Sequence, residues 1–158
     1  MSNGRRIRFP GPVLALLRAV AEQSPQPAYL VGGALRDAWL GRPWLDLDVT
    51  ARGARAAAAR LARSLAASFV VLDAENGVFR LVLPKGRGPL QIDFSELQGE
   101  DIAADLARRD FTVNALALPL APDLAAAVPA AALLDTRGGL DDLRRGVLRC
   151  ERDDILKA

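Results

Sequence analysis

The sequence has 158 residues, of which 51% are hydrophobic and 25% charged, a balance typical of one globular domain rather than a disordered chain. It contains no histidine and one cysteine, which excludes Ser-His-Asp and Cys-His catalysis, internal disulfides and zinc-thiolate clusters, and leaves carboxylates, arginines and backbone groups for chemistry. The net charge is only +2, but residues 1–80 hold 11 basic and 6 acidic side chains whereas residues 81–158 hold 10 and 13, so the first half carries the field that a polyanion would feel.

No apolar run approaches the roughly 20 residues that a membrane-spanning helix needs. Residues 1–13 carry charge without a continuous apolar stretch, which argues against a secretion signal. The lone Cys150 is compatible with a reducing compartment. We therefore expect a cytoplasmic protein that has no membrane partner.

The first half of the chain alternates helical and strand signals. Apolar residues recur at helical spacing after Pro12 and stop before Pro25. Short apolar runs that end at glycine or proline predict strands, and the alanine-rich stretch that follows them favours a helix. The predicted elements are a helix at 13–22, a strand at 28–33, a helix at 34–41, a strand at 44–51 and a helix at 52–67.

Beyond residue 68 the apolar pattern changes to that of strands, and Asn76-Gly77 is a strong hairpin signal. The sequence predicts strands at 69–73, 78–84 and 90–97, a basic turn at 85–88, a helix at 100–110, a helix or strand at 112–120, a loop at 121–132, an ordered segment at 133–150 and a helical start at 153–158. This order of elements predicts one mixed sheet with helices packed on it.

Asp46 and Asp48 flank Leu47 in the strand expected at 44–51. Side chains two residues apart in a strand project to the same face, so both carboxylates meet one side of the sheet. Like charges that lie close together repel each other and raise a pKa unless a cation lies between them, and a hard divalent ion with oxygen ligands meets that need. By itself, the D-x-D pattern more often marks a harmless pair on an exposed strand face.

Gly32 and Gly33 join the strand at 28–33 to the helix at 34–41. Glycines at such a turn let a phosphate approach bare N–H groups at the positive end of the helix dipole. Arg36, in the first helical turn, can add a forked charge to the same anion. A lone diglycine would more often make only a tight turn.

Asp93 has apolar neighbours on either side in the strand at 90–97, and an acidic side chain in a buried strand is costly without a partner. If this strand lies beside the one at 44–51, three carboxylates converge, and with nucleotide phosphates they suit two Mg²⁺ ions and in-line phosphoryl chemistry. A polar edge position is the competing interpretation. Glu96 has the opposite parity and is expected to be solvated.

A stripe of arginines is expected along one face of the helix at 52–67, formed by Arg52, Arg55, Arg60 and Arg63. Such a stripe can contact RNA phosphates. The simpler interpretation is a solvated helix face, because stripes of this kind are ordinary on amphipathic helices.

Three segments resemble the signatures of one family, the class II CCA-adding enzymes and bacterial poly(A) polymerases. LVGGALRDAWLGRPWLDLDVT (30–50) is similar to its first motif, with a diglycine, then R-D, then G, then D-x-D. RRDFTVNALAL (108–118) is similar to the second motif, and LLDTRGGLDDLRRGVLR (133–149) to the third. The segments cover about a third of the chain and follow one another in the family's order.

The resemblance implies roles for individual residues. In that family the diglycine and the following arginine hold the triphosphate, the D-x-D pair binds the catalytic metals, and the R-R-D-F-T-x-N segment contacts the sugar and phosphates of the incoming nucleotide. These roles fall here on Gly32, Gly33 and Arg36, on Asp46 and Asp48, and on Arg109, Asp110 and Asn114, while Asp93 occupies the strand of the family's third acidic residue. Taken alone, Arg108, Arg109 and Asp110 would more often form a helix-end salt bridge.

The resemblance also implies a fold and an activity. The fold is α+β, of the polymerase-beta nucleotidyltransferase type, with a mixed, mostly antiparallel sheet and helices packed on it. The activity is transfer of NMP from ATP or CTP to the 3′-hydroxyl of tRNA or other RNA, with two Mg²⁺ ions held by Asp46, Asp48 and Asp93. Whether the product is CCA, CC, A or a poly(A) tail does not follow from the sequence, nor does the oligomeric state.

Residues 1–158 are expected to form the head domain alone, because nothing matches the family's neck motif E-D-x-x-R, which pairs with the base, and the tRNA-gripping body and tail are missing. We expect such a head to be weakly active or inactive by itself. Two alternatives remain open. One is a small-molecule nucleotidyltransferase, against which the R-R-D-F-T-x-N motif argues, and the other is a non-catalytic nucleotide-binding module, against which the intact Asp46 and Asp48 argue.

Overall fold

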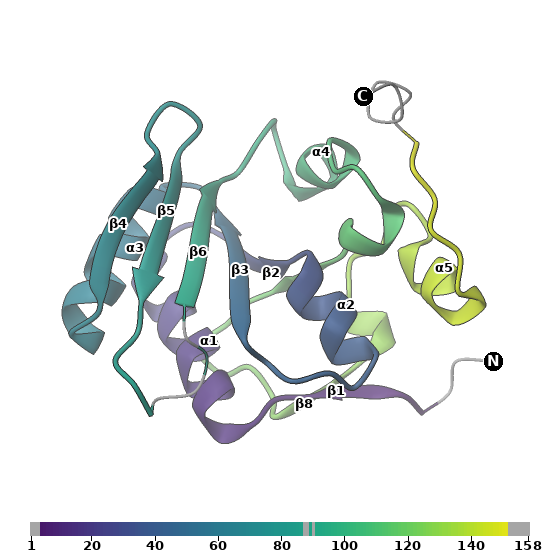
Figure 1. Cartoon of the computed structure of the whole chain (residues 1–158), viewed down its shortest axis with the longest axis horizontal. Helices are drawn as coiled ribbons and strands as arrows, with labels where there is room; N and C mark the ends of the chain where they lie inside the picture. The colour runs from purple at the N-terminus through teal and green to yellow at the C-terminus, as the bar shows by residue number, and fades with distance from the viewer. Residues whose placement is uncertain (1–3, 87–88, 90, 152–158) are drawn as a thin grey trace.

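The computed structural model describes residues 4–86, 89 and 91–151, and its centre is a six-stranded sheet (Figure 1). The strands lie in the order β4 (Ser68–Asp73), β5 (Val78–Val82), β6 (Gln91–Glu96), β3 (Asp46–Ala51), β2 (Ala28–Val31) and β7 (Ala117–Pro119). The β3–β6 pair is parallel, and every other neighbouring pair is antiparallel. The predicted α+β fold with a mixed, mostly antiparallel sheet is therefore confirmed.

Two helices, α1 (Gly11–Gln23) and α3 (Ala54–Leu65), pack against each other, and α3 also packs on β5 and β6. They lie behind these strands in Figure 1. Leu17 and Leu61 are fully buried in the core that results. The alanines of α3 let its backbone approach the sheet closely, since Ala54, Ala57, Ala58 and Ala62 all lie on its buried face.

Three short helices lie to the right of β3 in Figure 1: α2 (Gly33–Trp39), α4 (Ile102–Ala107) and α5 (Gly139–Arg145). The 3₁₀ turn η1 (Thr112–Asn114) packs against both α2 and α5. The segment 112–120, for which the sequence allowed helix or strand, therefore divides into η1 and β7. Its apolar run is too short for either period to dominate.

The segment 121–132 was expected to be a loop, and that prediction is wrong in part. It contains β8 (Ala127–Pro129) and the turn η2 (Ala130–Ala132), and β8 pairs with β1 (Arg6–Arg8) near the N-terminus. Ile7 and Val128 are register partners, and both are buried. Strands of three residues show no readable alternation, so only the tertiary structure reveals them.

The arginine stripe at the start of α3 and along it is exposed at Arg52, Arg55 and Arg63, as the simpler interpretation expected, but three of its four members also contact neighbouring segments. Arg60 donates two hydrogen bonds to the Gln23 carbonyl at the end of α1, at 3.1 and 2.6 Å. Arg52 donates to the carbonyls of residues 99 and 100, and the Arg55 guanidinium lies 5.8 Å from the centroid of the Phe79 ring. These contacts anchor α3 to its neighbours.

Glu96 is likewise not simply solvated. Its two carboxylate oxygens accept hydrogen bonds from the backbone N–H groups of Gly53 and Ala54, at 2.9 and 2.8 Å. A carboxylate in this position satisfies donors that the first turn of α3 leaves unpaired. Glu96 therefore fixes the start of α3 to the end of β6.

The helical start expected at 153–158 lies outside the described residues, as do Leu90 and part of the basic turn expected at 85–88. Among the residues that the structure describes, no helix is long and apolar enough to cross a membrane.

Candidate active site

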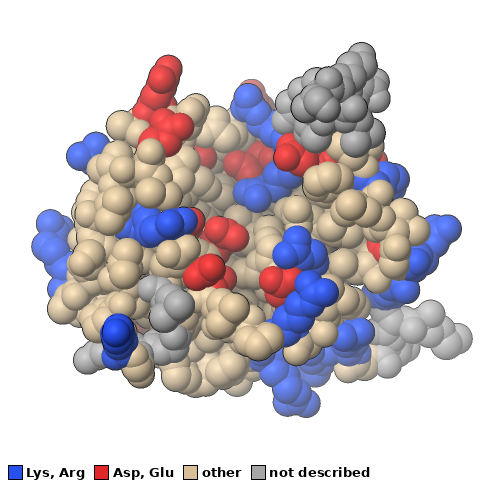
Figure 2. All heavy atoms as spheres, in the orientation of Figure 1, with Lys and Arg blue, Asp and Glu red and all other residues tan. Residues whose placement is uncertain are grey.

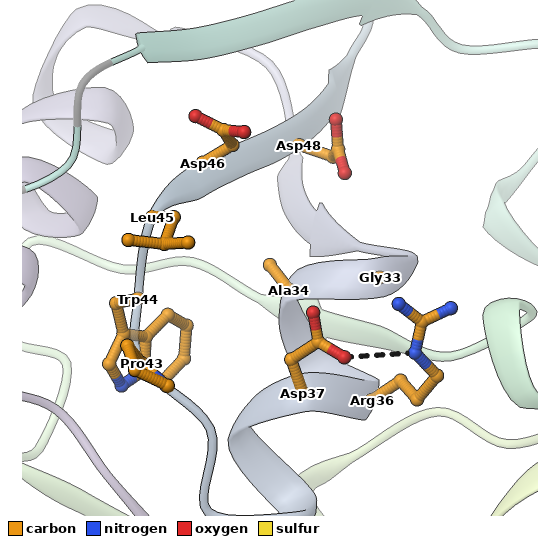
Figure 3. Close-up of a pocket in the computed structure, with 9 residues that line it drawn as sticks. All are labelled: Gly33, Ala34, Arg36, Asp37, Pro43, Trp44, Leu45, Asp46 and Asp48. Atoms are coloured by element: carbon orange, nitrogen blue, oxygen red, sulfur yellow. Dashed lines mark hydrogen bonds and ion pairs between the residues drawn. The ribbon is translucent and has the colours of Figure 1, made fainter.

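Asp46 and Asp48 lie on the same face of β3, as their spacing predicts. Leu47 and Val49 alternate with them and are fully buried on the opposite face. Figure 3 shows the two carboxylates projecting from β3 to one side of the strand, across from the first turn of α2. Asp46 is exposed, whereas Asp48 is half-buried.

Asp93 lies on β6 directly beside Asp48, because these two residues are register partners in the parallel β3–β6 pair. Burial and the nearby charges of Asp93 and Asp46 raise the pKa of the Asp48 carboxyl, although Arg109 and Arg80 act in the opposite direction. When neighbouring groups raise the pKa of a carboxyl group in this way, an added cation stabilises its ionised form. The crowding of negative charge at β3 and β6 is the physical feature that fits a divalent metal.

Arg80 already neutralises one member of this group. It faces Asp93 across the β5–β6 pair and forms a bidentate contact, with Nε and Nη2 at 2.7 and 2.8 Å from the two carboxylate oxygens. Within the described residues, no group of three or more acidic or cysteine side chains is arranged to hold a metal ion. As the side chains stand, Asp46 and Asp48 suit a cation, and Asp93 joins them only if the guanidinium of Arg80 gives way.

The diglycine turn brings backbone close to two guanidinium groups. Gly32 has φ +69° and ψ −140°, a conformation open essentially only to glycine. A Cβ atom added to Gly32 would lie 3.4 Å from Nη1 of Arg109 and 3.8 Å from Oδ2 of Asp48. One added to Gly33 would lie 3.3 Å from Nη2 of Arg36. The missing side chains therefore leave room between the carboxylates and the arginines.

Arg36 connects the segment of the first motif to that of the second. Its Nη1 donates to Oδ1 of Asn114 at 2.8 Å, and its Nε donates to Asp37 at 3.0 Å, which is the contact drawn in Figure 3. Asn114 belongs to η1, which is held against α2. Residues 78 positions apart in the chain are thus joined at one edge of the cleft.

Arg109 also faces the cleft, and it is only partly satisfied. Its Nη2 donates to Thr50 at 3.3 Å and to Asp105 at 3.2 Å, so the helix-end salt bridge considered for this segment is present. Its Nε is buried and has no hydrogen-bond partner among the described residues. A buried donor without a partner is costly, so the position of Arg109 is one that packing alone does not favour. Its Nη1 lies beside Gly32, on the side of the cleft.

These side chains surround two adjoining cavities that share Gly33 and Asp48. The first, of about 260 Å³, is lined by Asp46, Arg36 and the β3 approach, Pro43 to Leu45. The second, of about 300 Å³, is lined by Gly32, Asp93, Arg109 and Asn114. Figure 2 shows the corresponding hollow, with acidic and basic side chains gathered around it near the centre of this face.

Two residues of the second motif lie apart from these cavities. Asp110 is exposed and lines neither of them among the described residues. Arg108 is also exposed and lies with Arg109 at a shallower hollow bordered by Glu96 and Gln98. The role that the family resemblance implies for Asp110 stays a prediction.

The third motif holds the second in place, a function that the sequence interpretation missed. Thr112 Oγ1 donates to Asp142 of α5 at 2.5 Å, and Arg149 Nε donates to the same oxygen at 3.0 Å. The hydrogen bond from Thr112, together with Arg149, lowers the pKa of the Asp142 carboxyl despite its burial. Arg137 donates to the Arg109 carbonyl. The sequence signal for this role was the pattern of glycine and acidic residues in 133–149, but only the structure shows which residues of the second motif these residues contact.

Comparisons with known proteins show the family to which this fold belongs. Residues 28–84 and 83–149 match the family described as poly A polymerase head domain. A CC-adding tRNA nucleotidyltransferase of Geobacter sulfurreducens is 42% identical over 87% of this chain and 30% of its own length, and an A-adding enzyme of Deinococcus radiodurans is 38% identical over 85% and 28%. The solved Thermotoga maritima CCA-adding enzyme complexed with tRNA superposes with a TM-score of 0.77, at 34% identity, over 92% of this chain and 34% of its own.

The sheet and its helices have the polymerase-beta-type nucleotidyltransferase fold. The chain belongs to the poly(A) polymerase head-domain family. It spans about 30% of the length of the curated relatives that it matches.

Proposed function

We propose that this chain is the catalytic head of an RNA nucleotidyltransferase that works without a template. It would transfer NMP from ATP or CTP to the 3′-hydroxyl of tRNA or another RNA, with loss of pyrophosphate. One observation carries the proposal: the carboxylates of Asp46 and Asp48 share a cavity with Gly33 and Arg36, and Arg36 in turn contacts Asn114 of the second motif. The names of the similar proteins, which add CC, A or CCA to tRNA, support it.

The nucleotide triphosphate is the ligand that the positive side of the cleft suits. Arg36 lines the first cavity and can turn free N–H groups toward an anion, and Arg109 lines the second. Planar guanidinium groups bind phosphate oxygens in pairs, which fixes both the position and the orientation of the phosphates. Asn114, held by Arg36, lies where it can contact the sugar.

The opposite side of the cleft suits divalent metal ions, and we propose two Mg²⁺ ions held by Asp46, Asp48 and Asp93. When bound, such ions polarise the attacking hydroxyl and neutralise the charge on the departing phosphates. Asp46 and Asp48 supply oxygens from one strand face at no cost in backbone rearrangement. Arg80 must release at least one oxygen of Asp93 for that carboxylate to take part, since both now accept hydrogen bonds from it.

Transfer requires that the RNA 3′-end and the triphosphate be held in line. Protein side chains contribute this positioning, which removes much of the entropy cost of bringing the reactants together. The diglycine turn keeps the phosphate side of the cleft clear, and the contacts between η1, α2 and α5 keep Asn114 in place.

We also propose that the reaction takes place in the cytoplasm, on the basis of the single cysteine.

The decisive experiment is primer extension. The complete protein that carries this chain is incubated with tRNA lacking its 3′ end, Mg²⁺ and labelled ATP or CTP. We expect labelled tRNA with one or both nucleotides. A protein that binds nucleotide but extends no RNA would instead support the non-catalytic module, and labelling of a small molecule alone would support the small-molecule nucleotidyltransferase.

The cleft predicts poor discrimination between bases. Most of its polar side chains are carboxylates and arginines, which suit metals and phosphates, and the others are Ser95, Asn114 and the indole of Trp44. Rejection of a wrong base requires several directed hydrogen bonds to its edge. We expect residues 1–158 to bind ATP, CTP, GTP and UTP with similar, weak affinity in Mg²⁺. Calorimetric titration with all four measures this, and a clear preference for one base would contradict it.

Gly32→Ala is expected to remove nucleotide binding. The new methyl group would fill the space between Arg109 and Asp48 at ordinary contact distances, and the backbone conformation would cost about 1–3 kcal/mol of folding stability. Gly41→Ala is the matched control, because Gly41 also has a positive φ, +73°, but has open space around it. We expect both variants to unfold at lower temperature, and only Gly32→Ala to lose affinity for MgATP in calorimetry. Equal affinities in the two variants would remove the turn from the site.

A further inference from the structure

Arg5 and Arg144 lie over the ring of Trp39, the last residue of α2. Together with Arg42, three residues after Trp39, and Arg145, next to Arg144, they form what we call the Trp39 patch. The Arg5 guanidinium lies 5.0 Å from the centroid of the Trp39 ring, and that of Arg144 lies 5.4 Å from it. Arg5 precedes β1 and Arg144 lies in α5, so distant parts of the chain bring the two charges onto one indole ring. The ring itself is 3% exposed.

The patch is only partly neutralised by its neighbours. Arg42 shares the single carboxylate of Asp37 with Arg36, and Arg145 contacts Asp141 in the preceding turn of α5. Arg5 and Arg144 donate no hydrogen bond within the described residues, although both are exposed. The contact with the indole ring satisfies the face of a guanidinium group and uses none of its N–H donors. Such arginines are prepared to bind an anion.

The patch is continuous with the candidate active site. Arg36 lines the cavity that contains Asp46 and also a second hollow, of about 590 Å³, together with Arg42 and Asn114. Figure 2 shows basic side chains running from the edge of the acidic cleft toward the lower border of this face, over α2 and β1 of Figure 1. A chain of phosphates whose end lies in the cleft would therefore meet positive charge along this path.

We propose that the Trp39 patch binds the phosphate backbone of the RNA whose 3′-end enters the cleft. The inference rests on the proposed function, because it takes the cleft as the place where the RNA ends. Its continuity with the cleft favours RNA over an acidic lipid surface, for which a position next to the carboxylates would offer no advantage. The arginine stripe of α3 is less suited to this role, because Arg52 and Arg60 already donate hydrogen bonds to backbone carbonyls.

The test measures RNA affinity and its dependence on salt. Fluorescence anisotropy with labelled tRNA lacking its 3′ end is recorded between 50 and 200 mM salt for three double variants. Arg5→Gln/Arg144→Gln removes the two stacked charges, and Arg5→Lys/Arg144→Lys keeps the charges without the fork. Arg63→Gln/Lys85→Gln is the matched control, because it removes two exposed charges from α3 and from the turn after β5.

We expect the glutamine variant to bind RNA about tenfold more weakly at low salt, with a slope of log K against log salt that is smaller by about 1.4–1.8. The lysine variant should keep most of the slope, and the control should keep all of it. Circular dichroism and thermal unfolding show whether each variant is folded, and the lysine pair tests the charges if the glutamine pair does not fold.

Unchanged RNA affinity in a folded glutamine variant would overturn the proposal, as would a wild-type chain that binds nucleotide but no RNA even at 50 mM salt. Loss of binding to phosphatidylserine vesicles without loss of binding to RNA would overturn it in favour of a membrane surface. Calorimetry with MgATP distinguishes a failure of the proposed function from a failure of the proposal for the Trp39 patch. A wild-type chain that binds no nucleotide contradicts the proposed function, whereas nucleotide binding that is equal in all variants leaves the RNA result as the sole test of the patch.

Discussion

Replacing Asp48 with asparagine is expected to reduce nucleotide transfer by on the order of 10³-fold or more in the complete protein. The substitution keeps the volume of the side chain and removes its charge, so several kcal/mol of charge stabilisation in the transition state are lost while the packing remains. Primer extension with tRNA lacking its 3′ end measures the loss. Asp123→Asn, in an exposed position outside the cleft, is the matched control and should retain full activity.

The same substitution should stabilise the chain when no metal is present. The pKa of Asp48 in the folded chain is raised above its ordinary value of 3.8. Ionising this carboxyl group therefore costs more in the folded chain than in the unfolded chain, so the free energy of unfolding is highest below pH 3.8 and falls as pH rises through the folded-state pKa. Asp48→Asn does not suffer this loss. Chemical denaturation in a chelator should therefore show similar stability for both proteins near pH 4 and a more stable variant at pH 7.

Either result could contradict the assignment. Near-normal extension by the Asp48→Asn protein would remove this residue from the metal site. A variant less stable than the wild type at pH 7 would mean that the Asp48 carboxylate is favourably paired in the folded chain, contrary to the crowding that Asp93 and Asp46 impose.

Gly139→Ala is expected to destabilise the fold by about 3 kcal/mol or more. A Cβ atom at this position would lie 2.2 Å from the carbonyl oxygen of Thr112 and 2.9 Å from its carbonyl carbon, which is backbone against backbone. Such a clash cannot be relieved by rotating a side chain, so α5 must move away from η1. The melting temperature should fall by roughly 6–12 °C, given about 2–4 °C per kcal/mol for a domain of this size.

Gly11→Ala provides the control, because Gly11 begins α1 and has nothing within 4 Å of the added atom. It should be neutral or slightly stabilising, since alanine favours a helix over glycine. Differential scanning calorimetry of the two variants gives the comparison. A Gly139→Ala protein that melts within 1–2 °C of the wild type would show that α5 and η1 are not held as closely as described, and that the third motif does not position Asn114.

The sequence predicted the parts of the cleft that depend on local spacing. The period of two along a strand put Asp46 and Asp48 on one face, and the buried apolar neighbours of Asp93 indicated a second acidic strand. Most helices and strands also followed from apolar periodicity and from glycine and proline positions. The metal-binding and nucleotide-binding roles of the cleft residues stay predictions, because the structure contains no ligand that tests them.

The parts that the sequence did not predict depend on register between distant segments. The register of the β5–β6 pair places Arg80 opposite Asp93. A shift of that register by one residue would turn Arg80 to the other face of the sheet. The contact of Thr112 with Asp142 and the closeness of Gly139 to η1 depend on how α5 docks, which no local pattern encodes. The same holds for the pairing of β1 with β8.

The parallel pairing of β3 with β6 has a consequence for the order in which the chain folds. Thr50 and Ser95, which share a hydrogen bond across this pair, are 45 residues apart, whereas β4 and β5 are joined by a short turn. A local hairpin forms within microseconds, but a distant parallel pairing must first overcome the entropy of closing a long loop. We therefore expect the cleft to be absent from partly folded chains, so that a nucleotide at 100 times its Kd would stabilise only the complete fold, by about 2.7 kcal/mol. Nucleotide binding would then report the completion of folding.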